Sequence, residues 1–132
     1  TIEEAIIIGA DKIVVLDGTV LNKPRDKEDA CRMLGRLSGN VHTVYTGFTL
    51  IECPSMRSVS DFEVTNVKFR VLSEDEILAY VRSGSPMDKA GAYGIQDDYG
   101  AVFVERIEGC FYNVVGFPLA KFFVTLQEFC SH

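Results

Sequence analysis

The sequence predicts a single mixed α/β domain over residues 1–132, and three observations carry this prediction. The length of 132 residues suits one compact domain. Runs of β-branched residues alternate with segments whose apolar residues recur at helical spacing. Hydrophobic residues make up 47% of the chain and charged residues 24%, so a stable core is expected without staples.

The first elements are predicted to be strands. Ile6–Ile8 and Ile13–Leu16 are near-continuous aliphatic runs, which favour a central strand covered on both faces. We expect residues 9–12 (Gly-Ala-Asp-Lys) to break this strand. Asp17-Gly18 then predicts a turn, and residues 19–21 return as a short strand.

A helix is expected within residues 23–39. Asp26 is the predicted N-cap, and Asp29 places a carboxylate in the first turn, where the helix dipole favours it. Gly39 is expected to end the helix in a left-handed conformation. Four apolar residues fall at helical spacing between these ends: Ala30, Met33, Leu34 and Leu37.

The second half of the chain predicts a hairpin, a helix, a strand and a final helix. Residues 41–53 and 61–72 alternate in polarity and are expected to pair as antiparallel strands around a loop at 54–60. Ser73 and Glu76 form a capping box before a helix over Glu74–Arg82. After a glycine-rich loop, residues 101–109 predict a strand and 111–118 a turn region. Pro118 is expected to start a helix over Leu119–Phe129.

Composition excludes some classes of partner. The formal net charge of −6 argues against non-specific binding to nucleic acid or to an anionic membrane, whereas a nucleotide needs only a local positive site. No apolar run reaches the ~18 residues of a membrane helix. The four cysteines match no zinc spacing and favour free thiols in a reducing cytoplasm: Cys31, Cys53, Cys110 and Cys130. Residues 1–8 do not read as a signal peptide.

Asp11 is the first candidate for chemistry. It is a carboxylate inside an otherwise apolar strand region, and charged residues are rarely buried without a partner or a metal. Two interpretations stay open. Asp11 either bonds local backbone in a strand bulge, or it is a metal ligand or general base at the edge of a cleft.

The stretch from Ser83 to Ala101 is the second candidate, because its glycines surround a lysine. Gly91 and Gly94 would let backbone approach a ligand closely, and Lys89 suits an anionic group. Gln96 either reads a base edge or caps a turn. Asp97-Asp98 is interpreted as a solvated turn.

Two other residues have both a structural and a functional interpretation. Lys23 precedes Pro24 and is either a solvated lysine or a phosphate contact. His42 is interpreted as a half-exposed structural histidine. Enzymes that act on polyphosphates commonly use a divalent ion together with lysines. Asp11, Lys23, Lys89 and Gln96 together could therefore form a site for an anion and a metal.

These motifs resemble the Maf family of nucleoside triphosphate pyrophosphatases. The matching segments occur in the family's order over nearly the whole chain: "GADKIVVLDG", "LNKPRDKEDACRMLGRLSG", "DKAGAYGIQ" and "NVVGFPL". The resemblance implies a Maf/ITPase-like mixed sheet flanked by helices, elongated, with a central cleft. It also implies hydrolysis of dTTP or UTP to the monophosphate and pyrophosphate with Mg or Mn, a house-cleaning role, a link to septum formation in bacteria, and a homodimer.

The resemblance also implies a role for each candidate residue. Asp11 is similar to the family's catalytic acidic residue, which acts on the attacking water or on the metal. Lys23 and Lys89 look like its phosphate-contacting lysines. Gln96 matches the Gly-Ile-Gln signature of the branch that prefers dTTP and UTP.

The chain also departs from the family pattern. The first strand of the family and its Ser-x-Ser-Pro-Arg-Arg loop are absent, so we expect a chain that is incomplete at its N-terminal side. Lys12 stands where the family has threonine. It either donates to phosphate, or forms an ion pair with Asp11 and lowers the basicity of that carboxylate. The alternative function is therefore a weakened or inactive module that binds nucleotides or other proteins.

Overall fold

An antiparallel sheet is the frame of this protein. The computed structural model describes residues 4–97 and 99–131. Its five strands are ordered β2-β1-β3-β4-β5, and every pairing described is antiparallel. They are β1 (Ala5–Leu16), β2 (Thr19–Leu21), β3 (Val41–Cys53), β4 (Ser58–Phe69) and β5 (Val104–Glu108). The α/β class is confirmed, but the mixture of strand directions is not found.

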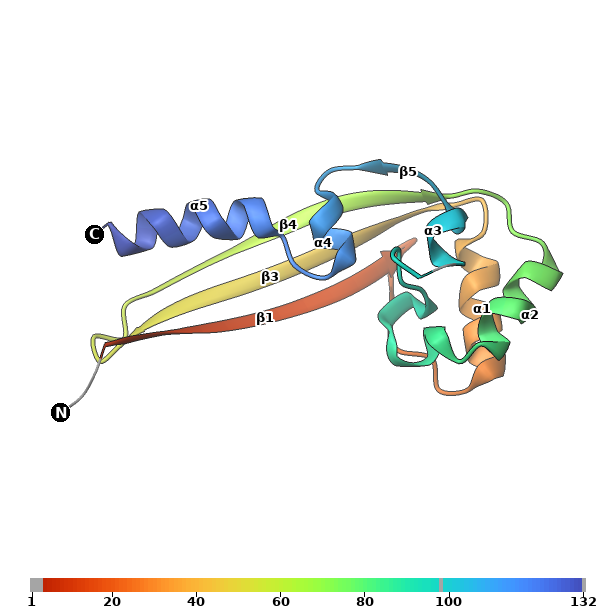
Figure 1. The fold of residues 1–132 in the computed structure, drawn as a ribbon, viewed down its shortest axis with the longest axis horizontal. Helices are drawn as coiled ribbons and strands as arrows, with labels where there is room; N and C mark the ends of the chain where they lie inside the picture. Colours follow the sequence, from red (N-terminus) through yellow and green to blue (C-terminus); the bar gives the residue numbers. More distant parts are fainter. Residues whose placement is uncertain (1–3, 98, 132) are drawn as a thin grey trace.

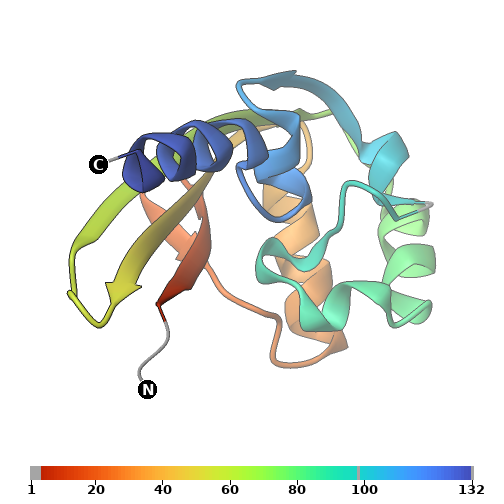
Figure 2. The ribbon, with the colours of Figure 1, turned by 60° about the vertical axis from the view of Figure 1, so that its left-hand side comes forward.

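Helices gather mainly at one end of this long sheet, which gives the molecule its elongated shape (Figure 1). They are α1 (Lys27–Leu37), α2 (Glu74–Arg82), α3 (Gly100–Phe103), α4 (Phe111–Val115) and α5 (Leu119–Cys130), with two 3₁₀ turns, η1 (Ser85–Asp88) and η2 (Ala90–Ala92). Figure 2 shows α1 and α2 together at one end of the sheet. Helix α5 lies over the part of the β3–β4 hairpin that is distant from α1 and α2. No described helix has the length and apolar character needed to cross a membrane.

The main core lies where the sheet meets α1, α2 and the glycine-rich segment. Val14, Val44 and Phe69 bring β1, β3 and β4 into this core, and each is at most 1% exposed. Leu34 and Leu37 of α1 are fully buried against them. The apolar face of α1 that the helical spacing predicted is therefore the face that enters this core, next to α2 and the glycine-rich segment.

The predicted break in the first strand is wrong. β1 is continuous, and residues 9–12 pair in register with β3, with Asp11 opposite Gly47 and Lys12 opposite Thr46. Cover on both faces is also not found, because residues 5–11 are exposed. A charged residue disfavours a buried strand, but it costs little on a strand that water reaches.

The three helix caps predicted for α1 and α2 are confirmed. The backbone N–H of Asp29 donates to Asp26 Oδ1 at 2.7 Å, as an N-cap requires. Gly39 ends α1 with a φ of 69°. The capping box of Ser73 and Glu76 has both of its hydrogen bonds, which fixes the start of α2.

Three predicted boundaries need correction. The loop at 54–60 is shorter, because β4 already begins at Ser58. Residues 101–103 are helical, so only 104–108 of the predicted strand is extended. The turn region at 111–118 contains helix α4. Its position depends on tertiary contacts, since Thr65 Oγ1 of β4 donates to the carbonyl of Cys110 at 3.0 Å just before the helix.

Candidate functional site

Asp11 lies on an open face of the sheet. Side chains alternate along a strand, so Asp11, Tyr45 and Phe62 belong to one face of β1, β3 and β4, which we call the outer face. Asp11 is exposed, and Gly47 directly opposite leaves room beside its carboxylate. A hollow of about 370 Å³ surrounds it, lined by Gly9, Ala10, Asp11, Gly47, Phe48, Thr49, Ser60 and Asp61.

Lys12 lies on the opposite, inner face. Its Nζ donates to the carbonyl of Val114 in α4 at 2.9 Å, and burial lowers the pKa of its ammonium group. The ion pair with Asp11, one of two expectations for this lysine, is not formed among the described residues. The reason is geometric, because successive residues of a strand point to opposite faces.

A buried polar cluster continues inward from Lys12. His42 is only 1% exposed, so the half-exposed histidine expected from sequence is wrong. Its Nε2 lies 2.6 Å from the hydroxyl of Tyr93, and burial together with the charge of Lys12 lowers the pKa of His42 to about 4. Within the described residues, His42 Nδ1, Thr46 Oγ1 and Asn113 Oδ1 are buried without a hydrogen-bond partner. The positions of these residues along the sequence do not indicate that they form a cluster.

Lys89 is held inside the glycine-rich segment. Its Nζ donates to the carbonyl of Ser85 at 2.7 Å and to Asp88 Oδ1 at 3.0 Å. Gly91 has a φ of 76°, and a Cβ there would lie 3.1 Å from a methyl of Val14, so the segment packs closely on β1. The sequence predicted that Gly91 lets backbone approach a ligand closely, and in the structure the close neighbour of Gly91 is Val14 of β1.

Contacts join the segment of Lys89 to that of Lys23. The backbone N–H of Gly91 donates to the carbonyl of Asn22 at 3.2 Å. The hydrogen bond from Lys89, and to a smaller degree the charges of Lys89 and Lys23, hold the pKa of Asp88 below its usual range. Lys23 itself is exposed. Tertiary folding therefore brings the segment that contains Lys23 next to the segment that contains Lys89.

Asp97 is not the solvated turn residue that the sequence suggested. Its Oδ2 accepts a hydrogen bond from the hydroxyl of Tyr80 at 2.7 Å and one from Ser85 Oγ at 3.3 Å. Lys89 Nζ lies 3.7 Å from the same oxygen. Burial, and then the hydrogen bond with Asp97, raise the pKa of Tyr80. Asp98 lies outside the described residues.

Gln96 is exposed next to Asp97, at the rim of a hollow of about 350 Å³. The other residues that line this hollow are Tyr80, Ser83, Ser85, Asp97 and Tyr99. An amide, hydroxyls and an exposed aromatic ring there provide hydrogen bonding and stacking in one place.

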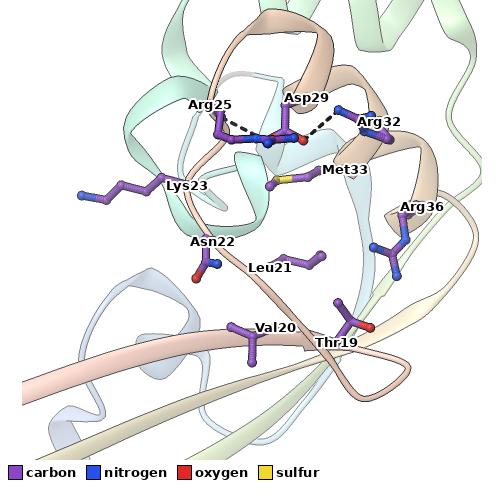
Figure 3. A pocket seen from close by; sticks show the side chains of 10 residues that line it. All are labelled: Thr19, Val20, Leu21, Asn22, Lys23, Arg25, Asp29, Arg32, Met33 and Arg36. Carbon is purple, nitrogen blue, oxygen red and sulfur yellow. Dashed lines mark hydrogen bonds and ion pairs between the residues drawn. The ribbon is translucent and has the colours of Figure 1, made fainter.

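A further hollow, of about 380 Å³, lies between β2 and α1 (Figure 3). We call it the basic pocket, because Lys23, Arg25, Arg32 and Arg36 line it with Asp29 as the one acidic residue. The remaining lining residues are Thr19, Val20, Leu21, Asn22 and Met33. Among all the lining residues, only Lys23 is a candidate site residue from sequence, although Arg32 and Arg36 already stand four residues apart within the predicted helix.

No contact among the described residues joins Asp11 to Lys23, Lys89 or Gln96. β2 pairs with β1 from Leu16 opposite Thr19 to Val14 opposite Leu21, and it ends there, two residues before Lys23. In residues 4–97 and 99–131, no group of three or more His, Cys, Asp or Glu side chains could hold a metal ion.

Comparison with known proteins gives consistent matches. A family model described as "Maf-like protein" matches residues 1–129. The chain is 54% identical over 127 residues to a protein of Carboxydothermus hydrogenoformans named dTTP/UTP pyrophosphatase, a match that covers 96% of this chain and 68% of that protein. An Acetivibrio thermocellus protein of the same name is 52% identical over 127 residues, covering 96% and 62%. This chain therefore spans about two thirds of the length of these curated relatives.

Proposed function

The chain belongs to the Maf-like protein family, and on this premise we propose that it is a nucleoside triphosphate pyrophosphohydrolase. We propose that it converts dTTP and UTP to the monophosphate and pyrophosphate. The observation that carries this proposal is the identity of about half of all residues, over 96% of the chain, to proteins named dTTP/UTP pyrophosphatase.

Asp11 is the proposed catalytic residue. Its exposure and the glycine opposite it leave space for a water molecule and a phosphate beside the carboxylate. As a base, Asp11 would take the proton of the water that cleaves the α–β phosphoanhydride.

Asp11 is also the proposed ligand for Mg²⁺ or Mn²⁺. Magnesium is commonly held by one or two carboxylates together with substrate phosphates and waters, so one exposed carboxylate fits this role. A bound divalent ion would supply Lewis-acid stabilisation of the phosphoryl oxygens.

Lys23 and Lys89 are the proposed phosphate contacts, and Gln96 the proposed contact to the base. Lys23 is exposed, and its ammonium is free to swing toward a phosphate. Lys89 is restrained by Ser85 and Asp88, which keeps its charge beside the glycine-rich backbone. The hollow at Gln96, with Tyr99 on its rim, offers a pyrimidine both an amide and a ring for stacking.

The direct test is pyrophosphate release by this 132-residue chain with UTP, dTTP, CTP and 7-methyl-GTP in the presence of Mg²⁺ or Mn²⁺. We expect release from UTP and dTTP, and a loss of at least about a hundredfold in Asp11→Asn. Asp17→Asn, which changes another exposed carboxylate of the β1–β2 hairpin, is the matched control. Nucleotide binding without release would instead support the alternative of an inactive binding module.

Lys12 needs its own test, because its Nζ is engaged by Val114. We propose that it contacts phosphate through the N–H donors of its ammonium group that Val114 does not use. A Lys12→Thr variant with an unchanged KM for UTP would assign it to anchoring α4. A raised KM with unchanged kcat would assign it to phosphate binding.

We further propose that the protein forms a homodimer and acts in the cytoplasm. Phe62 and Val64 on the outer face are 57% and 36% exposed, as side chains at an interface often are in an isolated chain. The four cysteines are unpaired, which suits a reducing compartment. Light scattering coupled to size exclusion tests the dimer, and Phe62→Lys should disrupt it.

A further inference from the structure

The basic pocket concentrates positive charge in an acidic protein. Four of the 13 basic residues line it against a single acidic one, although the chain has a formal net charge of −6. Such a local reversal of sign raises the concentration of anions at that place. Its volume of about 380 Å³ exceeds what a few phosphate groups require.

Asp29 orients two of these basic groups. It is 8% exposed, and it accepts a hydrogen bond from the backbone N–H of Arg25 at 3.0 Å and one from Arg32 at 3.1 Å. The Arg25 guanidinium lies 3.6 Å from the same carboxylate. One nearly buried acid thus holds two guanidinium groups at the rim, and each keeps further N–H donors for a ligand.

Arg36 is the third guanidinium group, and it is arranged differently. Figure 3 shows it directed from α1 toward Thr19 of β2, into the hollow. Among residues 4–97 and 99–131, no carboxylate lies within ion-pair distance of it. Arg36 therefore has its full set of donors available, next to the hydroxyl of Thr19.

The ligand that fits this arrangement carries several phosphates. Planar guanidinium groups bind phosphate through paired hydrogen bonds, and three of them suit more than one phosphate group. The pocket is also continuous with Lys23, which the proposed function assigns to the triphosphate. A polyphosphate could thus extend from Lys23 along α1 toward Arg36.

We infer that the basic pocket binds the pyrophosphate group, as the β and γ phosphates of the nucleotide and as the free product, through Arg25, Arg32 and Arg36. This inference rests on the proposed function and adds three specific contacts to it. Arg32 and Arg36 contribute binding in this assignment, and neither takes part in the chemical step.

The test is calorimetric titration of the 132-residue chain with pyrophosphate in EDTA, which excludes hydrolysis. We expect Arg36→Gln and Arg32→Gln each to weaken binding about tenfold, because each removes charge-assisted hydrogen bonds. Arg106→Gln makes the same change of charge at an exposed position of β5 and should stay within about twofold. The loss of affinity in Arg36→Lys should be intermediate, since lysine keeps the positive charge but lacks the planar pair of N–H donors of a guanidinium group.

A competition experiment then tests whether the pocket binds the phosphates of the nucleotide. UTP should displace pyrophosphate from the chain, whereas uridine should not. Simultaneous binding of UTP and pyrophosphate, no binding of pyrophosphate, or equal losses in Arg36→Gln and Arg106→Gln would each overturn the inference. Circular dichroism verifies that the variants are folded. Arg36→Gln removes no described ion pair, so it should fold even if Arg32→Gln does not.

The two proposals can fail separately. Pyrophosphate bound in this pocket, without release from any nucleotide, would refute the enzyme and keep the subsite. Turnover of UTP that is insensitive to Arg36→Gln, together with no binding of pyrophosphate, would refute the subsite and keep the enzyme.

Discussion

The two ends of β1 have similar sequences and different surroundings. Ile7 and Ile8 near its start are 54% and 51% exposed, whereas Val14 and Leu16 near its end are 1% and 2% exposed. At its end β1 pairs with β2 as well as β3, and Gly91 packs against Val14. Aliphatic residues thus favour a strand at both ends, but only neighbouring elements decide which end belongs to the core.

The comparison separates stability from chemistry. Val14 lies in the packed core, while Asp11 stands three residues earlier on an open face. A carboxylate in the core would have to be paired or neutralised, whereas on the outer face it stays hydrated and accessible. Substitutions at the packed end should therefore affect folding, and those on the open part should leave folding almost unchanged.

The largest difference is expected between two phenylalanines of β4. Phe69 is fully buried and Phe62 is 57% exposed. Phe69→Ala should lower the free energy of unfolding by about 3–5 kcal/mol, because it leaves a cavity. Phe62→Ala should change it by at most about 0.5 kcal/mol when the protein is dilute enough to be monomeric, since Phe62 then has no partner to pack on. Chemical denaturation measures both values, and equal losses would contradict the division of the sheet.

A pH dependence should come from His42 at the packed end. Its pKa is lowered from 6.5 to about 4. Between these two pH values the unfolded chain binds a proton at His42 that the folded chain does not bind. The free energy of unfolding should therefore fall as the pH drops from 6.5 toward 4, by about 3 kcal/mol at most. Urea denaturation at several pH values should show a shallower dependence in His42→Gln. Identical slopes would mean that other groups cause it.

A smaller difference is expected between two threonines. Thr65 is fully buried and joins Asn113 Nδ2 and the carbonyl of Cys110, both at 3.0 Å. Thr65→Val should cost about 1–3 kcal/mol, because it removes both hydrogen bonds at a fully buried position. Thr49, which bonds Ser60 on the outer face, should tolerate Thr49→Val within about 0.5 kcal/mol. Thermal unfolding of the two variants makes the comparison, and a larger cost at Thr49 would reverse it.

Local patterns were sufficient to predict much of the fold. Asp26, the capping box at Ser73 and the apolar spacing of α1 are signals within a few residues, and the structure contains all three features. The break at residues 9–12 and the turn at 111–118 were wrong for one reason. Both segments are shaped by residues far away in the sequence, β3 in the first case and Thr65 in the second.

The candidate site likewise has residues that the sequence identified and residues that only the folded structure brings together. Asp11, Lys23, Lys89 and Gln96 were identified from sequence motifs, and their roles stay predictions. The basic pocket was missed except for Lys23, because its wall joins α1 to β2. Asp97 was misread as a solvated turn because its partner Tyr80 lies 17 residues away on α2.

By itself, the sequence determined the helix caps, the strand-forming segments and the set of residues that resemble a nucleotide site, since each depends on local chemistry. The tertiary structure decided which end of β1 is buried, that Asp11 and Lys12 serve opposite faces, and that three arginines face one hollow. Burial and charge clustering depend on strand register and helix packing, which connect residues that no short stretch of sequence brings together.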